Sequence, residues 1–260
     1  MKRDNIFWGG VLILFGVLFL LQNAGFITNV FALFWPLILI LVGGWIVLGV
    51  FWKPTLDAAD TFSVPLGEAK HVRYRFSHGA AQIQITGGAP EGQAILGSSA
   101  VGMNFHSHSD GDRLEVKVDT GPSFIPVLGP AGGMWRYQIT QAVPVSLTIE
   151  AGASTFEVDL QEVLASEIEL KAGASTFNVT LPARGVSRLE LEGGAASFNL
   201  RIPEGTAARI NAVADFTALN VDRDRFPQLD SGVYQSPDFD TSPNRTDIRL
   251  RAGVGSITVK

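Results

Sequence analysis

The sequence predicts a mainly β protein: a single-stack, solenoid-like domain with repeats of about 21 residues, preceded by a two-helix transmembrane hairpin. The repeat prediction rests on three similar segments: VSLTIEAGASTFEVDL (residues 145–160), EIELKAGASTFNVTL (167–181) and RLELEGGAASFNLRI (188–202). A fixed period of this size is typical of proteins in which every unit buries its apolar face against its neighbours. The hairpin prediction rests on two long apolar runs near the N-terminus.

The two apolar runs cover residues 6–22 and 30–52, and we assign the hairpin to residues 1–55. The second run is long enough to cross the hydrocarbon core with some tilt, whereas the first is slightly short for a span. Two alternatives remain open. The first run has the length of a cleaved signal peptide, although no small-residue cleavage site follows it, and both runs could be buried helices of a soluble core.

The positive charges near the hairpin predict its orientation. Lys2 and Arg3 precede the first run and Lys53 follows the second, while the connecting turn contains neither Lys nor Arg. Because cytoplasmic flanks of membrane spans are enriched in Lys and Arg, we expect both termini in the cytoplasm. The sequence therefore predicts a multi-pass protein of the cell membrane whose β-domain faces the cytoplasm.

Each repeat predicts two short strands joined at a corner of small residues. In the first copy the apolar side chains fall on odd positions before the corner (Val145, Leu147, Ile149) and on even positions after it (Phe156, Val158, Leu160). Alternation with period two is the pattern of a half-buried strand. The change of parity is expected if the chain bends at Gly152 and both strands then point into one core.

Stacking the repeats places equivalent residues above one another. We expect one internal column formed by Phe156, Phe177, Phe198 and Leu219. Asn178, Asn199 and Asn220, headed by Glu157, share the same 21-residue step and predict a ladder of stacked amides. The alternative is ordinary solvated polarity on the outside of the strands.

The rest of the chain is assigned by comparison with these repeats. The last segment repeats the motif with Ile257 in the position of Phe156, and a Pro-, Asp- and Ser-rich insertion at about 222–244 predicts a long surface loop. Residues 142–260 are therefore the regular repeat region. Residues 60–141 are predicted to be an irregular, membrane-proximal β region, within which residues 71–87 share the repeat cadence and Gly111 marks a hairpin.

Composition restricts the classes of function. The net charge is −5 overall, +2 over residues 1–53 and therefore −7 over the rest, which disfavours a nucleic-acid partner. The chain has no cysteine, which excludes disulfides, zinc–thiolate sites and thiol catalysis. No phosphate-binding glycine loop or other cofactor motif occurs, so we expect no cofactor and no small-molecule substrate.

Few residues suggest a chemical site. His106, His108 and Asp110 lie at alternate positions and could share a metal, but we favour the alternative that they form a polar hairpin end, and we expect no metal site. Other candidates are the corner hydroxyls (Ser154, Thr155, Ser175, Thr176), for which no base is evident, and the acids Asp222, Asp224, Asp238 and Asp240, which could bind calcium but suit a solvated loop. The glycosylation sequons at Asn178 and Asn244 carry little weight, because the motif is short and common. We expect no catalytic residues and no enzyme, with a hydrolase in residues 60–141 as a remaining alternative.

The string FWPLILILVGGWIVLG, after a first run ending FLLQNAGF, resembles the transmembrane hairpin of LiaF-like bacterial proteins. The GASTFNV-type repeats resemble the toast-rack β-domain that accompanies such hairpins. The resemblance implies a role in cell-envelope stress signalling, as a membrane partner of a sensor kinase, and it implies no catalytic residues.

These observations together predict a membrane-anchored, non-enzymatic sensory or regulatory scaffold. Its expected partners are the lipid bilayer and a membrane protein such as a sensor kinase, or a second copy of the chain. The alternative is an outward-facing adhesion or structural protein of the cell envelope.

Overall fold

A computed structural model of the 260-residue chain describes residues 60–79, 81–99, 104–119, 134–212 and 218–260, together with isolated positions between 13 and 39. The chain divides into two compact units, residues 1–54 and residues 55–260. The predicted spans, 6–22 and 30–52, lie mostly outside the described residues. Within the part of the chain that is described, no helix has the length and apolarity needed to cross a membrane.

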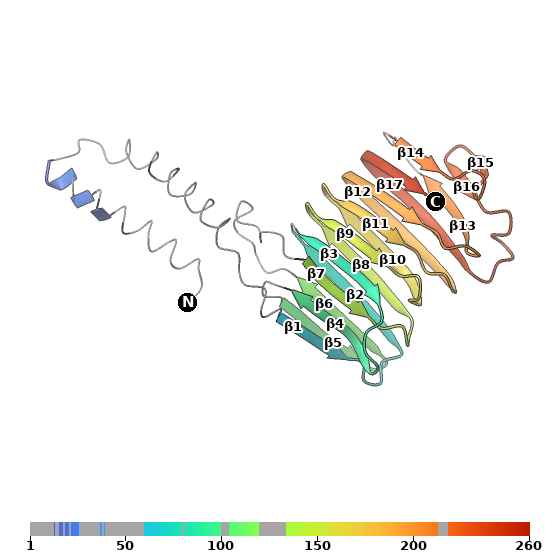
Figure 1. Cartoon of the computed structure of the whole chain (residues 1–260), viewed down its shortest axis with the longest axis horizontal. Helices are drawn as coiled ribbons and strands as arrows, with labels where there is room; N and C mark the ends of the chain where they lie inside the picture. Colours follow the sequence, from blue (N-terminus) through green and yellow to red (C-terminus); the bar gives the residue numbers. More distant parts are fainter. Residues whose placement is uncertain are drawn as a thin grey trace. The chain divides into compact units, whose positions relative to one another are not determined.

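The second unit is built from β-strands that form one continuous sheet (Figure 1). The described strands are β1 (Asp60–Pro65), β2 (His71–His78), β3 (Gln82–Gly87), β4 (Gln93–Ser99), β5 (Asn104–Asp110), β6 (Arg113–Asp119), β7 (Met134–Ile139), β8 (Val145–Ala151), β9 (Thr155–Asp159), β10 (Ala165–Ala172), β11 (Thr176–Thr180), β12 (Val186–Arg201), β13 (Ala207–Ala212), β14 (Ala218–Val221), β15 (Gln228–Asp230), β16 (Val233–Gln235) and β17 (Arg245–Val259). The mainly β, solenoid-like prediction is confirmed for these residues.

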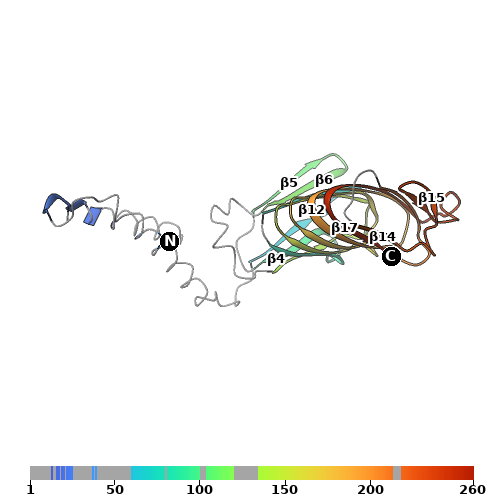
Figure 2. The ribbon, with the colours of Figure 1, turned by 90° about the horizontal axis from the view of Figure 1, so that it is seen from above.

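Pairing arranges the strands in two layers that face each other across the core. The first layer runs β5, β6, β2, β8, β10, β12, β17, β13, β16 and β15. The second runs β1, β4, β7, β3, β9, β11, β12, β17 and β14. The long strands β12 and β17 pass through both layers, and each remaining coil contributes one strand to each layer. Figure 2 shows the coils as flattened loops that nearly superimpose.

Neighbouring strands of the repeats run parallel, and each residue pairs with the residue one repeat, 21 positions, away in the sequence. Ile168 lies beside Leu147 and Leu189, while Phe177 lies beside Phe156 and Phe198. The predicted region 60–141 contributes two coils with the same pairing, β2–β3 and β6–β7, and Ile83 lies opposite Phe156 as its cadence suggests. The hairpin at Gly111, which has a φ of 59°, joins β5 to β6 as predicted.

The corner between the layers requires glycine because successive coils approach closely there. A Cβ atom on Gly152 would lie 2.6 Å from the carbonyl oxygen of Gly79, and one on Gly173 would lie 2.9 Å from that of Gly152. The same carbonyl oxygens accept hydrogen bonds from the next coil, from Ala153 N at 2.7 Å and Ala174 N at 2.8 Å. The backbone ladder therefore continues around the corner without a gap.

The core is the space between the layers, and the predicted column lies in it. Phe156, Phe177 and Phe198 are each 0% exposed, and their rings stack at centroid distances of 4.7 and 5.3 Å. Their inward orientation is therefore confirmed. Stacked aromatic rings of successive coils add favourable contacts to the burial of their area.

The predicted order of the last coils is wrong. We expected Leu219 to follow Phe198 directly, but Ile257 of β17 lies between them, beside Phe198 on one side and Leu219 on the other. The period identifies which residues point inward, and Ile257 and Leu219 both satisfy it. It does not identify which coil becomes the neighbour, because both coils carry inward apolar side chains at equivalent positions.

Candidate functional site

An open groove of about 970 Å³ runs along the glycine corner. Its floor is formed by backbone and small side chains, among them Gly79, Gly152, Gly173, Gly194 and Gly253. The lining residues come from six consecutive strands of the first layer, from β6 to β17. At about 4.8 Å per strand the groove extends roughly 24 Å.

One wall of the groove carries a row of charged side chains, whose sign alternates over the four strands β8, β10, β12 and β17. From β6 to β17 the charged members are Asp119, Glu150, Lys171, Glu192 and Arg251. Arg251 pairs with Glu192 at 3.5 Å across the coils. These side chains are substantially exposed, so each ion pair stabilises the fold by only a few tenths of a kcal/mol, up to about 1 kcal/mol.

Lys171 forms the shortest of the described ion pairs, with Glu169 on its own strand at 2.7 Å. A hydrogen bond from Lys171 lowers the pKa of Glu169, aided by a hydrogen bond from the hydroxyl of Thr148. The same contact raises the pKa of Lys171. Both groups are therefore charged across the whole physiological pH range.

A buried polar cluster lies at one end of the groove. His78 lines the groove but is only 3% exposed, and its Nε2 lies 3.3 Å from the hydroxyl of Tyr137. Its Nδ1 and the Nε1 of Trp135 are buried and have no hydrogen-bond partner among the described residues. Burial lowers the pKa of His78 to about 4, against the opposing attraction of Asp119. The imidazole is therefore neutral at neutral pH.

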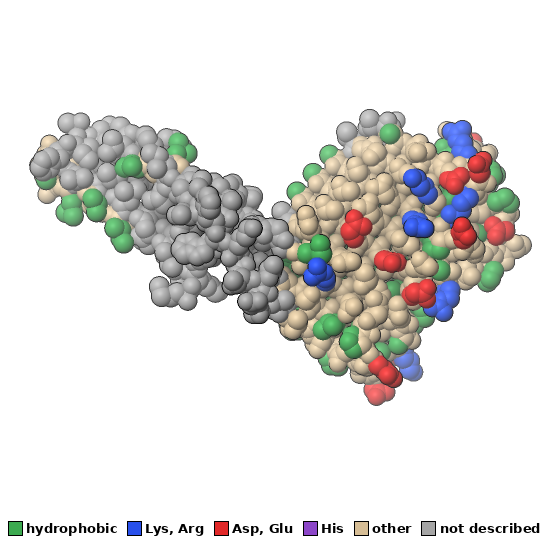
Figure 3. Space-filling view, viewed as in Figure 1, with side chains coloured by type: hydrophobic (Ala, Val, Ile, Leu, Met, Phe, Trp, Pro, Cys, Tyr) green, Lys and Arg blue, Asp and Glu red, His purple; other side chains and the backbone are tan. Residues whose placement is uncertain are grey.

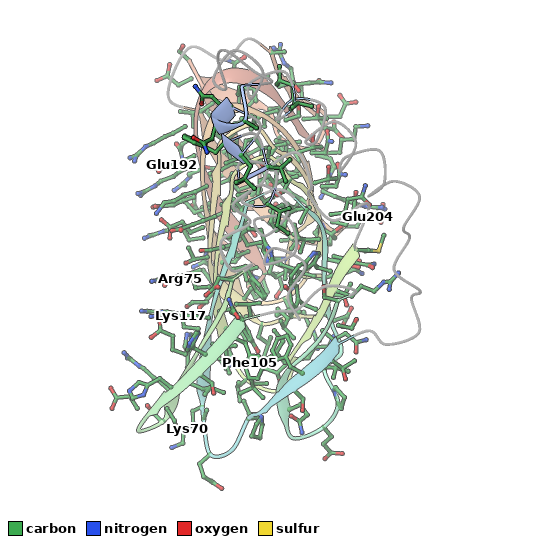
Figure 4. The ribbon with its side chains drawn as sticks, turned by 90° about the vertical axis from the view of Figure 1, so that its left-hand side faces the viewer. Lys70, Arg75, Phe105, Lys117, Glu192 and Glu204 are labelled. Atoms are coloured by element: carbon green, nitrogen blue, oxygen red, sulfur yellow. The ribbon has the colours of Figure 1, made fainter. Side chains whose placement is uncertain are left out.

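The outer face of the first layer is covered with charged side chains of both signs. Figure 4 shows Lys117, Arg75 and Glu192 projecting from the same side of the stack, whereas Figure 3 shows the opposite face, on which charged side chains are sparser. Short side chains on β8, Ser146 and Thr148, leave a trough of about 350 Å³ between the longer side chains of β2 and β10. Mixed charge of this kind keeps a sheet face soluble and resists non-specific association.

The outer face of the second layer is mostly neutral and carries the predicted amide ladder. Asn199 Nδ2 donates to Asn178 Oδ1 at 2.7 Å, and Asn178 Nδ2 donates to Glu157 at 2.5 Å. The ladder is confirmed over these three residues. Thr258 separates Asn199 from Asn220, because β17 lies between β12 and β14.

The predicted metal candidates lie on β5, the end strand of the first layer, whose residues are all exposed. His106 faces Lys117, His108 faces Glu115 and Asp110 faces Arg113 on the paired strand. Two of these three neighbours are cations, which would repel a metal ion. Across the residues that the structure describes, no group of three or more His, Asp or Glu side chains is arranged to hold a metal ion.

The hydroxyls of the corner serines, Ser154 and Ser175, form hydrogen bonds to the backbone of neighbouring coils. Ser175 Oγ accepts from Ser154 N and donates to Gly152 O, each at 3.1 Å, and both serines are buried. Thr155 and Thr176 lie on the outer face of the second layer, outside the core.

Two of the four loop acids, Asp222 and Asp240, make separate local contacts through their carboxylates. Asp222 accepts from the backbone N–H of Asp224, and Asp240 pairs with Arg209 at 3.0 Å. The predicted loop at 222–244 also contains the short strands β15 and β16. Thr241 donates to the backbone carbonyl of Asp238.

Sequence reasoning missed the groove and the buried cluster. The charged wall had a visible signal, since Glu150, Lys171 and Glu192 recur at the 21-residue step with alternating sign. The cluster of His78, Trp135 and Tyr137 had none, because β2 and β7 are brought together from positions far apart in sequence.

Comparison with known proteins gives two family matches. Residues 54–201 match the N-terminal domain of toast_rack, DUF2154, and residues 6–47 match the LiaI-LiaF-like transmembrane region. No curated protein matches the chain.

Two solved structures are similar to the β-domain. The structure of "a putative cell adhesion protein" from Clostridium sporogenes has 16% identity and a TM-score of 0.69, and the match covers 78% of this chain and 98% of that one. The structure of "a putative adhesin" from Bacteroides fragilis has 11% identity with the same coverage, and its TM-score of 0.28 does not indicate a shared fold.

The first likeness shows a shared β fold, in agreement with the strand pairing described above. The transmembrane match places the chain in the membrane, as its apolar runs predict. This chain is a LiaF-like membrane-anchored envelope protein and belongs to the toast_rack family.

Proposed function

We propose that this protein is a non-enzymatic sensory or regulatory scaffold of the envelope-stress type, which binds partner proteins through its β-domain. The observation that carries the proposal is the corner groove, which is open, extends over six strands and has a floor of backbone with one wall of charged side chains of both signs. Sites for small molecules are usually enclosed hollows with a few convergent polar groups. A long open groove suits an extended polypeptide better.

The chemistry of the groove supports a binding role rather than catalysis. The hydroxyl that lines it, that of Ser77, donates to the carboxylate of Glu150. The corner hydroxyls of Ser154 and Ser175 are engaged in hydrogen bonds that hold the corner. The buried imidazole of His78 contacts Tyr137, Trp135 and Phe156 rather than a nucleophile. A nucleophile requires a positioned base within hydrogen-bond reach.

The partner we propose is a membrane protein, such as a sensor kinase, whose cytoplasmic segment lies in the groove. The wall has three carboxylates and two cations, so a partner segment with a matching alternation of charge would be selected by electrostatic complementarity. The net negative charge of the domain disfavours nucleic acid in this role.

Site-specific photo-cross-linking in native membranes tests this proposal. A photoreactive residue at Glu192, on the groove wall, is expected to give an adduct with one membrane protein. The same residue at Asn199, on the opposite face, is expected to give none. The Glu192 adduct should disappear when Lys171→Glu and Arg251→Glu invert the wall charges. Equal adducts from both faces, or an adduct insensitive to charge inversion, would overturn the role of the groove.

An outward-facing adhesion or structural protein is the second candidate, because the fold is shared with a structure described as a putative cell adhesion protein. Topology separates the candidates. The chain has no cysteine, so Thr155→Cys, at an exposed position, would be the single reactive thiol. With both termini in the cytoplasm, an impermeant maleimide should label it only after the cells are permeabilised. Labelling of intact cells would favour the outward-facing candidate.

A further inference from the structure

Strand β17 interrupts the otherwise sequential order of the repeats. It pairs with β12 in both layers on one side, and with β13 and β14 on the other. The coil formed by β13 and β14 follows β12 in sequence but lies one strand further away in space. The stack therefore contains a slot, between β12 and the β13–β14 coil, which β17 fills.

The two walls of the slot are already in register with each other. Asp247 lies between Arg188 and Arg209, and Ser256 lies between Ser197 and Ala218. Each of these flanking pairs is separated by 21 positions in sequence, the same step that relates directly paired neighbours such as Thr176 and Ser197. A movement of one strand spacing, about 4.8 Å, would bring the walls together in the regular register of the repeat.

The connection between the walls is also long enough for direct contact. Residues 160–164 and 181–185 link neighbouring coils of the stack, with five residues each. Residues 202–206 also number five, but they link coils separated by β17. The inward side chains would still match after closure, since Leu189 would face Ile210 and Phe198 would face Leu219.

Charge favours the form in which β17 is inserted. Arg249 pairs with Glu190 at 3.6 Å and Arg251 with Glu192 at 3.5 Å, and Ser187 shares a 2.7 Å hydrogen bond with Thr246. Closure without β17 would lose these contacts. It would also place Arg188 opposite Arg209, and like charges directly opposite each other destabilise a strand pair.

We propose that β17 is an exchangeable strand and that the slot accepts β17 from a second copy of this chain. A released β17 has two unpaired backbone edges. The empty slot has two as well, one on β12 and one on the β13–β14 coil. The slot of another copy offers the released strand the same register, inward contacts and ion pairs. When β17 leaves, β12 can pair directly with the β13–β14 coil. This pairing lowers the free energy of the intermediate in which β17 is released. This self-association goes beyond the partner-binding role of the groove and does not depend on it.

Disulfide trapping in the full-length protein tests the exchange. Ser197 and Ser256 are register partners whose hydroxyl oxygens lie 3.2 Å apart. Full-length chains with Ser197→Cys and Ser256→Cys, each with a different tag, are co-expressed in bacterial membranes and oxidised. We expect a dimer joined by a mixed disulfide between the two positions. The double variant in one chain should form an internal bond and so confirm the local geometry.

A control pair of cysteine variants measures the disulfides that form when two chains collide at random through the outer faces of their second layers. Thr155 and Ser197 lie in the same row of the second layer, but β11 lies between their strands. Co-expressed Thr155→Cys and Ser197→Cys chains should give at least tenfold less mixed dimer. An equal yield from this pair would overturn the proposal. An internal disulfide in the double variant, with no mixed dimer between the singly substituted Ser197→Cys and Ser256→Cys chains, would also overturn it.

A second variant detects the closed slot. Ser197 and Ala218 both flank Ser256, so they are two strand spacings apart, about 10 Å, which is too far for a disulfide. We expect the double variant Ser197→Cys/Ala218→Cys to form an internal disulfide slowly, with β17 then cleaved by trypsin. If the disulfide never forms while mixed dimers do, closure is not part of the exchange route.

Discussion

Phe156 and Phe177 stack in the core with their ring centroids 4.7 Å apart and their planes inclined by only 4°. They come from neighbouring coils at the same point of the repeat, and they pair directly in the second layer. The stacking distance matches the spacing of the strands that bear the rings. The repeat period of the sequence is therefore visible as a physical contact.

Phe177→Ala is expected to destabilise the β-domain by about 3–5 kcal/mol, because the ring is fully buried between two others and its loss leaves a cavity. Denaturant unfolding of residues 55–260, a compact unit with its own core, measures the loss. Thr176→Ala, one residue away on the outer face, is the control and should change stability little. A loss below about 1 kcal/mol for Phe177→Ala would contradict its central position in the column.

Alanine substitution at equivalent corner glycines should have graded effects. A Cβ on Gly152 would lie 2.6 Å from a backbone carbonyl oxygen, whereas one on Gly194 would lie 3.3 Å from its nearest neighbour. We expect Gly152→Ala to cost about 1–3 kcal/mol through overpacking, and Gly194→Ala clearly less. Thermal unfolding of the two variants side by side tests the order, and equal midpoints would show that the corner relaxes freely.

The domain should lose stability as pH falls from about 6.5 to 4. Burial lowers the pKa of His78 to about 4, so between these pH values the unfolded chain binds a proton that the folded chain excludes. Stability from the neutral imidazole is thus present in full above pH 6.5 and is lost down to pH 4, by roughly 3 kcal/mol. Denaturant midpoints between pH 5 and 6.5, above the carboxylate range, measure the slope.

The control for this slope replaces the histidine itself. His78→Gln should be less stable at neutral pH but should flatten the dependence between pH 5 and 6.5. The matched change His106→Gln, at an exposed position on β5, should leave the slope intact. An unchanged slope in His78→Gln would assign the pH dependence to other groups.

The amide ladder predicts a charge effect on the outer face. Asn178 lies between Glu157 and Asn199 and is hydrogen-bonded to both. Asn178→Asp places a second carboxylate against Glu157, so we expect it to be less stable than Asn178→Ala by about 0.5–1 kcal/mol at low salt. High salt should reduce the difference. Asn220→Asp, which lies beside Thr258, should show no such penalty if the ladder geometry is correct.

The sequence by itself determined the repeating unit. The step between Gly152, Gly173 and Gly194 located the corner, and the change of apolar parity across it identified Phe156 and its equivalents as inward residues. Such inferences succeed because strand alternation and corner packing are local properties that every copy must satisfy. The same local rules placed Ile257 and Leu219 correctly in the core.

The tertiary structure alone decided which coils become neighbours. β17 lies between β12 and the β13–β14 coil because Arg249 and Arg251 match Glu190 and Glu192, and Asp247 separates two arginines. It also decided that His78, Trp135 and Tyr137 share one buried cluster at the end of the groove. Periodicity is the same for every coil, so it cannot rank coils of equal register, whereas side-chain contacts between particular coils can.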